Sequence, residues 1–157
     1  MDAEPRGDEE LATVAETEAF GARLAAGLTG GDLVILDGPL GAGKTALTRG
    51  IAAGLGVRGR VSSPTYVIAR VHRGTADGPD LVHVDAYRLI DAADPLGELD
   101  ALDLDAELDD AVVVVEWGRG LVESLTDRHL LVRLSRADGS EVRTARWAWS
   151  DAPAGER

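Results

Sequence analysis

Apolar and polar residues follow two kinds of pattern along this chain, one typical of buried strands and one typical of helices. Residues 33–37 (LVILD) and 111–115 (AVVVV) are short, nearly continuous apolar runs, as expected for strands buried on both faces of a sheet. Residues 11–28 instead carry large apolar side chains at a four-residue spacing. Because that spacing places them on one side of a helix, we expect an amphipathic helix that packs on the sheet.

The rest of the hydrophobic pattern predicts a second helix and two hairpins. Residues 45–55 repeat apolar side chains every four positions and end at glycine, a common helix stop. The alternating stretch 66–72 and the apolar run 81–85 predict one hairpin with a long loop. Residues 129–134 and 141–149, joined across an Asp-Gly pair, predict another. Together these elements predict a three-layer α/β domain whose central sheet is mixed and mainly parallel.

The segment between the first buried strand and the second helix has the pattern of a phosphate-binding loop. Its sequence over residues 38–45 is GPLGAGKT, and the order of strand, glycine-rich loop and helix is the one such loops require. Glycines allow several backbone N–H groups to point into one hollow, and the helix N-terminus adds about half a positive charge behind them. The loop therefore predicts a P-loop domain that binds a nucleoside di- or triphosphate.

The lysine of this loop is unusual for a chain of this composition. Lys44 is the only lysine of a chain in which fifteen arginines carry the rest of the positive charge. A compact ammonium on a thin stem can lie along terminal phosphates, whereas arginine presents a broad planar fork. A glycine-rich turn with an incidental lysine is the simpler alternative. The pattern, its flanking elements and the single lysine all favour the phosphate site.

Acidic residues close two of the predicted strands. Asp85 ends the run 81–85, and Glu116 follows the run 111–115. Ligands of open α/β sheets bind beyond the carboxyl ends of strands, so both acids should lie near the loop. The Thr45 hydroxyl is expected to take a Mg²⁺ coordination position. One acid would complete that shell and the other would orient or deprotonate the attacking water; which acid has which role stays open, and a strand-end acid can also have no chemical role.

Composition indicates one domain and narrows the classes of partner. We expect a single domain over 1–157 with flexible tails at 1–10 and 151–157. The absence of cysteine excludes disulfides and cysteine-rich zinc sites. A net charge of −12 opposes direct binding to RNA or DNA. Because the N-terminus lacks an apolar signal core and no stretch is long enough to span a membrane, we expect a cytoplasmic protein without membrane contact.

The negative charge is concentrated in one segment. Residues 91–110 contain nine carboxylates and neither lysine nor arginine. The simpler interpretation is a solvated surface with short helices, on which the interspersed leucines, Leu96 among them, face the core. The alternative is a docking face for a basic partner, which the same charges would steer into place.

Four segments follow one another along the chain: residues 41–45 (GAGKT), 63–66 (SPTY), 83–89 (HVDAYRL) and 115–117 (VEW). Taken in this order, they resemble the bacterial TsaE (YjeE) family of P-loop ATPases. The phosphate loop alone is a weak family signal, but the second and third segments, at their spacing from the loop, are far more specific. The resemblance extends over nearly the whole chain.

This resemblance implies an ATPase that serves the protein pair TsaB and TsaD in making N6-threonylcarbamoyladenosine at position 37 of tRNA, with tRNA met only through that complex. Weak, partner-dependent and Mg²⁺-dependent ATP hydrolysis is implied, with Asp85 at the hydrolytic site. Ser63 and Thr65 would form a switch loop that senses the terminal phosphate; an ordinary turn at the start of a strand is the alternative. The implied metal ligands are Thr45 and Glu116.

Nucleotide contacts are expected from two further sources. By the resemblance, Trp117 lies near the nucleotide, although core packing would also explain it. Thr13 and Thr17 are expected to reach the adenine pocket if the first helix packs beside the loop. Arg88 or Arg119 could stabilise charge in the transition state. The full set expected to bind ATP or to act on it with Mg²⁺ is Leu40, Gly41, Ala42, Gly43, Lys44, Thr45, Thr13, Trp117, Asp85 and Glu116.

Other nucleotide-dependent functions are less well supported. A GTPase that reads guanine through an Asn-Lys-x-Asp motif is excluded, because the chain contains no asparagine. A small P-loop kinase would need a second pocket and an arginine-rich lid, for which the predicted C-terminal hairpin leaves no room. A docking module that switches on ATP binding without needing hydrolysis is the remaining alternative.

Overall fold

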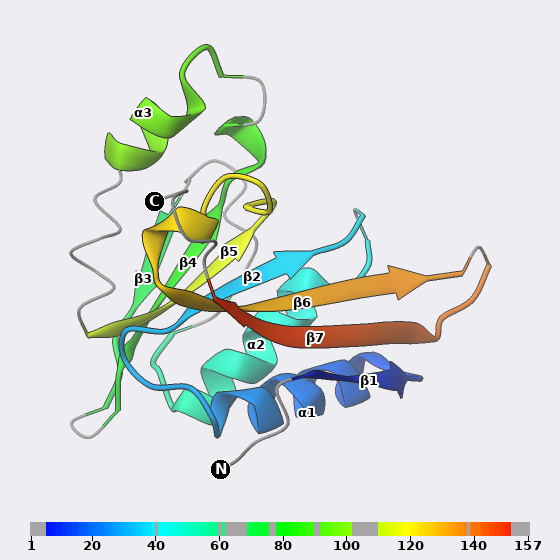
Figure 1. The fold of residues 1–157 in the computed structure, drawn as a ribbon. Coiled ribbons are helices and arrows are strands. Elements are labelled where there is room, and N and C mark those ends of the chain that lie inside the picture. Colours follow the sequence, from blue (N-terminus) through cyan, green and yellow to red (C-terminus); the bar gives the residue numbers. More distant parts are fainter. Residues whose placement is uncertain are drawn as a thin grey trace.

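The computed structural model describes residues 6–39, 41–59, 61, 69–75, 78–89, 92–101, 110–137 and 139–151, and it has the mixed α/β architecture expected from the sequence (Figure 1). The strands are β1 (Arg6–Leu11), β2 (Leu33–Asp37), β3 (Ala69–His72), β4 (Asp80–Asp85), β5 (Ala111–Glu116), β6 (Arg128–Arg136) and β7 (Arg143–Asp151). The helices are α1 (Val14–Ala25), α2 (Lys44–Leu55) and α3 (Pro95–Ala101), with 3-10 turns η1 (Tyr87–Leu89) and η2 (Glu123–Leu125).

The described strands form one seven-stranded sheet in the order β1-β7-β6-β2-β5-β4-β3. Strands β6, β2, β5 and β4 are parallel to their neighbours within that group, whereas β7 and β3 run antiparallel beside them. The expected mixed, mainly parallel sheet is therefore confirmed. Every residue of β5 is buried, as the apolar run 111–115 indicated, because β5 lies between β2 and β4 with both faces covered.

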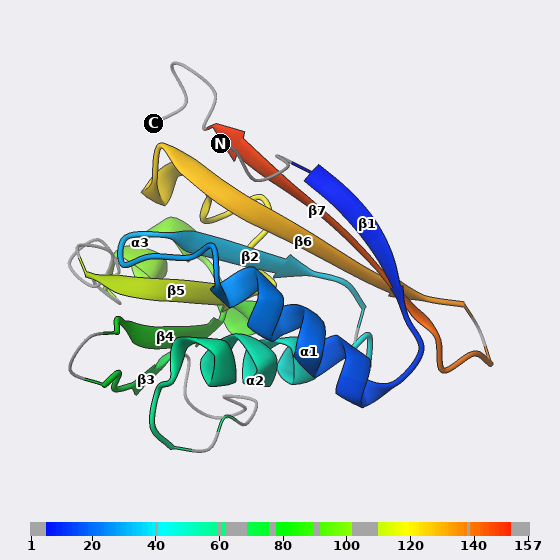
Figure 2. The same cartoon turned by 90° about the horizontal axis from the view of Figure 1, so that it is seen from below.

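Helices α1 and α2 lie together across one face of the sheet (Figure 2). Phe20 of α1 and Leu47 of α2 share a core with Leu36 and Val114 of the sheet. The two helices approach closely enough that a Cβ on Gly50 would stand 2.0 Å from the backbone oxygen of Glu18. A glycine is needed at that crossing because any side chain would force the helices apart. The tight pairing holds the start of α2 in place against α1.

The opposite face of the sheet has a thinner cover. Leu89 of η1 and Val122, just before η2, pack on Val84, Val113 and Val115 of β4 and β5. Helix α3 lies beyond the carboxyl end of β4, at the top of the molecule (Figure 1). Within the described segments, the third layer of the predicted three-layer domain therefore consists mainly of short turns, and α3 is near the edge where the candidate acids end their strands.

The N-terminal segment corrects one expectation. Residues 6–10, expected to belong to a flexible tail, form strand β1 and pair with β7. The sequence did not predict this strand because most of its side chains are charged. An edge strand gains most of its stability from backbone hydrogen bonds and tolerates charge on its exposed face. At the other end, β7 continues to Asp151, which pairs with Arg128.

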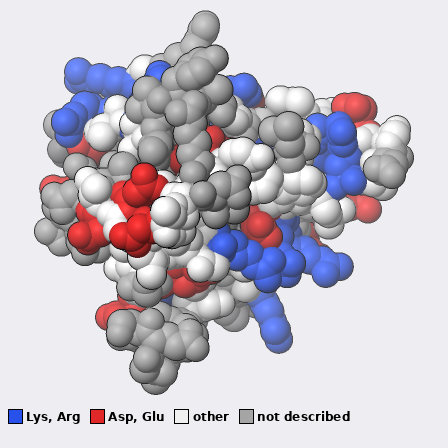
Figure 3. Space-filling model, turned by 90° about the horizontal axis from the view of Figure 1, so that it is seen from above, with Lys and Arg blue, Asp and Glu red and all other residues white. Residues whose placement is uncertain are grey.

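The acidic segment is only partly described, and α3 is its described helix. Leu96 was expected to face the core, but its side chain is 62% exposed, among the exposed acids Asp94, Glu98 and Asp100. Figure 3 shows acidic side chains gathered on one part of this face of the molecule and basic side chains gathered on another. The interpretation of Leu96 as a core residue was wrong, because a helix of seven residues beyond the sheet edge has little apolar surface to pack against.

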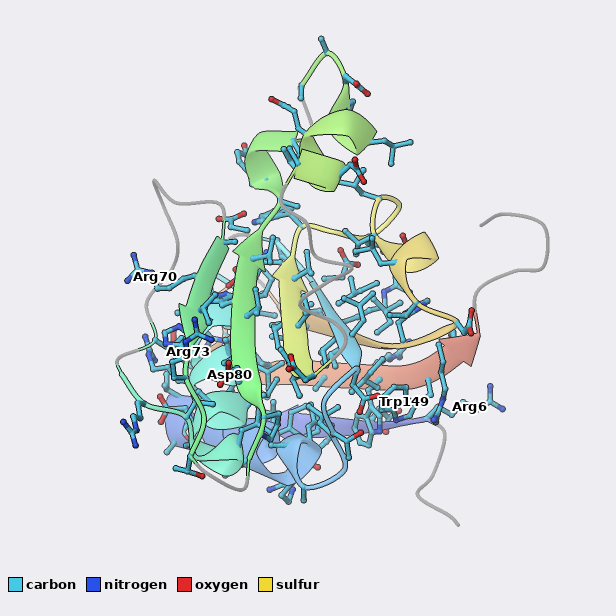
Figure 4. All side chains as sticks on the ribbon, turned by 90° about the vertical axis from the view of Figure 1, so that its left-hand side faces the viewer. Arg6, Arg70, Arg73, Asp80 and Trp149 are labelled. Carbon is cyan, nitrogen blue, oxygen red and sulfur yellow. The ribbon has the colours of Figure 1, made fainter. Side chains whose placement is uncertain are left out.

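A local polar contact lies at the β3–β4 edge of the sheet. Figure 4 shows Arg73 and Asp80 close together at the β3–β4 hairpin, and Arg6 and Trp149 on the other side of the sheet. Asp80 accepts a 2.7 Å bond from the Gly74 N–H and a 2.8 Å bond from Arg73, and these bonds lower the pKa of its carboxyl. Both contacts stabilise the hairpin locally.

No helix in the described part of the chain is long and apolar enough to cross a membrane.

Candidate nucleotide site

The loop between β2 and α2 has the backbone geometry of a phosphate cradle. Gly41 and Gly43 have φ values of 83° and 105°, in the left-handed region that residues with a side chain rarely adopt. Gly43 is the N-cap of α2 and provides no side-chain cap. The first N–H groups of α2 therefore have no capping oxygen from that residue, and such groups favour an anion at the helix start.

Lys44 is buried in this loop. Its side chain turns back so that Nζ donates a 2.5 Å hydrogen bond to the carbonyl of Gly38, and the residue as a whole is 5% exposed. Burial lowers the pKa of Lys44, while the charges of Glu116, Asp37 and Asp85 raise it. The Lys44 ammonium therefore interacts electrostatically with three carboxylates beside the glycine loop, where a bound phosphate would add further negative charge.

Trp117 covers the amine of Lys44. The centroid of its ring is 3.6 Å from Nζ, close enough for a cation–π interaction. Trp117 is the one non-glycine residue in the described segments with a positive φ, at 64°, and strained backbone of this kind is concentrated at functional sites. Tyr87 packs edge-on against the ring at a centroid distance of 5.1 Å. The expected place of Trp117 beside the nucleotide loop is thus supported by its contact with Lys44.

Glu116 is fixed by a buried histidine. Its Oε2 lies 2.5 Å from His83 Nε2, and both side chains are almost fully buried. Nδ1 of His83 has no hydrogen-bond partner, so Glu116 is the only described group that orients this ring. A carboxylate oriented in this way resembles a metal ligand supported by a neighbouring side chain.

Asp85 and Glu116 stand side by side at the carboxyl edge of the sheet. They are paired in the parallel register of β4 and β5, as expected from their positions at the ends of two strands. Asp85 differs from Glu116 in its surroundings, because it is only half-buried and its Oδ1 accepts a 2.9 Å bond from the Tyr87 N–H. One carboxylate is therefore held in the core and the other faces the loop edge.

A third acid, Asp37, ends β2 directly before the loop. Arg119 Nη1 lies 3.1 Å from its Oδ2, and Arg133 Nε lies 3.6 Å from the same oxygen. Arg119, one of the two arginines considered for the transition state, is thus at this edge but already pairs with a carboxylate. The side chain of Arg88, the other candidate, lies outside the described part of the structure.

The threonines of the site are at two helix starts. Thr45 occupies the second position of α2 and is half-buried. Thr13 caps α1, and its Oγ1 accepts a 3.1 Å bond from the Glu16 N–H. Thr17, one turn further on, lies 3.8 Å from the position that a Cβ on Gly43 would occupy. The expectation that α1 packs beside the loop is confirmed, while a role of Thr13 at the adenine stays a prediction.

Several predicted residues lie outside the described structure, and some important contacts were not predicted. Leu40 and the switch-loop residues Ser63 and Thr65 belong to the undescribed part of the chain. No role was predicted for His83, although the alternation of residues 83 and 85 along β4 places both on the same face of the sheet as Glu116. That alternation could have revealed the contact between His83 and Glu116.

The donor set fits a magnesium nucleotide. Among the described residues no three histidine or acidic side chains form a metal cluster, and a Mg²⁺ that is held with phosphates does not need one. Such an ion takes one or two protein oxygens together with phosphate oxygens and water. The hydroxyl of Thr45, next to Lys44 in the chain, and the carboxylate of Glu116, whose charge acts on Lys44, are oxygens of that kind.

Comparisons with known proteins agree with this geometry. The family model described as "Threonylcarbamoyl adenosine biosynthesis protein TsaE" matches residues 11–145. A protein of Mycobacterium bovis named "tRNA threonylcarbamoyladenosine biosynthesis protein TsaE" is 55% identical over 146 residues, which is 91% of this chain and 87% of that protein. The protein of the same name from Streptomyces coelicolor is 57% identical over 142 residues, or 84% of this chain and 94% of that protein.

A solved structure has the same fold. The crystal structure of YdiB from Bacillus subtilis superposes with a TM-score of 0.71 and is 28% identical in sequence. The match covers 98% of this chain and 90% of that one. The two proteins therefore share their overall fold along most of both chains.

Proposed function

This chain belongs to the TsaE family, and we propose that it binds and hydrolyses ATP as a component of the system that makes N6-threonylcarbamoyladenosine in tRNA. The observation that best supports the proposal is the position of Lys44. Its buried amine follows the left-handed glycine loop and donates to the carbonyl of Gly38, and the charges of three strand-end carboxylates act on it. This is the arrangement that a magnesium–triphosphate needs, because cations and backbone N–H groups face the phosphates while acids face the metal and water.

The phosphate loop would bind the phosphate chain of ATP. Its residues 41–45 supply N–H groups and the positive end of the α2 dipole. On binding, the Lys44 amine would exchange its bond with the Gly38 carbonyl for a bond to a terminal phosphate oxygen. The ring of Trp117 would keep that amine in place and exclude water from one side of it. Charge that develops on the leaving phosphates is then met by a cation already oriented by the fold.

The two strand-end acids would have different roles, one at the metal ion and one at the attacking water. Thr45 and Glu116 would hold Mg²⁺, which supplies neutralisation of phosphate charge when it is bound. His83 keeps the Glu116 carboxylate pointed in one direction. Asp85, which faces the edge and among the described residues bonds only to the backbone of Tyr87, would accept a hydrogen bond from the attacking water and align it with the terminal phosphorus. Burial thus favours the metal role for Glu116 and the water role for Asp85.

The proposed partners are the TsaB and TsaD pair, with tRNA reached only through that complex, in the cytoplasm. Slow hydrolysis by the isolated chain would support repeated turnover of the TsaB–TsaD transferase. Exposed apolar side chains near the nucleotide edge suit a protein partner: Tyr87 is 57% exposed and Leu96 is 62% exposed. Because acids surround Leu96 on α3, we propose a basic docking surface on the partner.

A nucleotide-dependent switch is the second candidate function. The same exposed Tyr87 favours it, because this residue touches the ring of Trp117 that covers Lys44. The binding or release of phosphates at Lys44 could therefore change a docking surface at Tyr87 through the ring of Trp117, without any need for hydrolysis. The two candidates differ in whether the water-aligning acid is required.

Hydrolysis in the presence and absence of magnesium tests the proposal. Phosphate release from ATP by the wild-type chain, alone and with TsaB–TsaD, should require Mg²⁺ and should rise when the partners are added. A Glu116→Gln variant should bind ADP in EDTA as the wild type does, yet lose about 100-fold in Mg²⁺-dependent rate. If Asp85→Asn abolishes hydrolysis but still supports tRNA modification, the switch function is correct and hydrolysis is incidental. Failure of the wild type to bind ATP would contradict both functions.

A further inference from the structure

One arginine reaches the phosphate loop from the far end of the chain. Arg143, the first residue of β7, donates from Nη2 to the carbonyl of Gly41 at 3.2 Å. Its Nε lies 3.8 Å from the position that a Cβ on Gly43 would occupy. Arg143 therefore bonds to one of the left-handed glycines that shape the cradle and lies close to the other, although it is 102 residues away from Gly41 in sequence.

The fold holds Arg143 in this position from several directions. In the sheet register its backbone lies between Leu11 of β1 and Arg136 of β6. A 2.7 Å bond from Nη1 to the Glu141 carbonyl fixes the guanidinium. Only 13% of the side chain is exposed. A rigid sheet residue of this kind loses little entropy when it binds a ligand.

The charge of this guanidinium is poorly balanced within the protein. Of the described residues only Glu141 brings a carboxylate near it, at 3.5 Å, and that side chain is 84% exposed. Arginine has five N–H donors, and the described contacts use them on two backbone carbonyls and this one distant carboxylate. A largely buried cation with donors that no described contact uses, beside a phosphate cradle, is suited to an anionic ligand.

The position of Arg143 complements that of Lys44. Lys44 is covered by Trp117, which follows β5, whereas Arg143 comes from β7, and these two strands lie on opposite sides of β2 in the sheet. The loop that follows β2 thus has a cation on each side. A phosphate chain lying in the loop would meet Lys44 at one end and Arg143 nearer to Thr17 and the start of α1.

We propose that Arg143 is a nucleotide-binding residue, which donates from its guanidinium to the phosphate chain of the bound nucleotide and holds the Gly41 peptide in its turned orientation. This inference rests on the proposed binding of ATP. It assigns to the C-terminal hairpin a direct part in ligand binding, so that β6, β7 and β1 do more than extend the sheet.

Nucleotide titrations with three variants test the assignment. Arg143→Ala should weaken binding of ADP and ATP by about 10- to 100-fold, because hydrogen bonds to charged groups are among the stronger ones. Arg143→Lys should recover part of the loss, since it restores the charge without the planar fork. The matched control is Arg136→Ala, which removes an exposed arginine of the same hairpin, the strand partner of Arg143; its affinity should equal that of the wild type.

Two further readouts separate ligand contact from a structural role. Binding of adenosine, which has no phosphate, should be changed far less by Arg143→Ala than binding of ADP, and the thermal midpoint without nucleotide should stay near that of the wild type. If wild type and Arg143→Ala bind ADP equally, the inference is wrong and the proposed function stands. An equal loss for adenosine and ADP, together with early melting, would show a structural role only and would also overturn it. If the wild type binds no nucleotide, the proposed function itself fails.

Discussion

The candidate nucleotide site lies at the carboxyl edge of the sheet, and its two sides are built in opposite ways. The phosphate side is one continuous segment, residues 38–45, and its shape depends on backbone conformation, with φ of 83° at Gly41 and 105° at Gly43. The carboxylate side is assembled from the ends of β2, β4 and β5, and it depends on side chains that meet only in the folded sheet. His83 and Glu116, which touch there, are 33 residues apart.

This difference determines how each side can fail. A local segment can be damaged by one change in backbone freedom while the domain stays folded. A side built from buried side chains is coupled to the core, so a substitution there changes both chemistry and packing. Lys44 belongs to both sides, because it is part of the loop and its charge interacts with all three acids.

The largest effect is expected from Lys44→Ala. This variant removes the cation that both sides share, and ATP turnover should fall by about 100- to 1,000-fold. Phosphate release measures the rate, and circular dichroism with a thermal melt establishes that the variant is folded. A folded Lys44→Ala protein that hydrolyses ATP at the wild-type rate would show that the loop is not the site of catalysis.

A smaller effect is expected on the carboxylate side from His83→Asn. Without the histidine, Glu116 loses its described hydrogen-bond partner, and the concentration of Mg²⁺ needed for half-maximal hydrolysis should rise by about 10- to 100-fold. The control is His129→Asn, since His129 is also a buried histidine with an unpartnered Nδ1 but belongs to β6 at its amino end. Equal changes in the two variants would mean that His83 acts through stability alone.

On the loop side, Gly41→Ala should separate local geometry from packing. A Cβ would meet nothing within 4 Å at either Gly41 or Gly56, and φ is positive at both, 83° and 75°. Each alanine variant should therefore lose about 1–2 kcal/mol of stability from backbone strain. Only Gly41→Ala should also weaken ADP binding in a calorimetric titration. A similar loss of affinity in Gly56→Ala would mean that the loop has no special dependence on its backbone.

The smallest effect is a dependence of folding stability on pH, and it should not involve the nucleotide site. Burial lowers the pKa of His72 and of His129; His83 and Arg70 lower that of His72 further, and Glu123 opposes the shift at His129. The unfolded chain therefore binds more protons below about pH 6.5, so stability should fall as pH decreases through that value.

Urea midpoints at pH 7.0 and 5.5 measure this loss. Asp80, whose pKa is lowered, loses its contribution only at more acidic pH, so this window reports the histidines. His129→Leu should have a shallower pH dependence than the wild type. An unchanged slope would contradict the assignment of the pH effect to burial of this histidine.

The sequence was informative where function depends on local patterns. The segment 38–45 predicted the loop, and apolar runs with terminal acids predicted that Asp85 and Glu116 would meet. It failed where a contact depends on tertiary neighbours, as for the pairing of His83 with Glu116. Strand β1 was missed because its charged residues carry no apolar signal, and Arg143 was missed because nothing in its local sequence shows that the hairpin returns to the loop.

The central claim is that ATP handling by this chain supports repeated modification of tRNA. The direct test is multiple-turnover formation of threonylcarbamoyladenosine on tRNA by TsaB, TsaD and threonylcarbamoyl-adenylate with ATP, comparing no addition, the wild-type chain and Lys44→Ala. We predict sustained turnover only with the wild type. Turnover that is equal in all three reactions, from a wild-type chain that hydrolyses ATP, would contradict the role in tRNA modification.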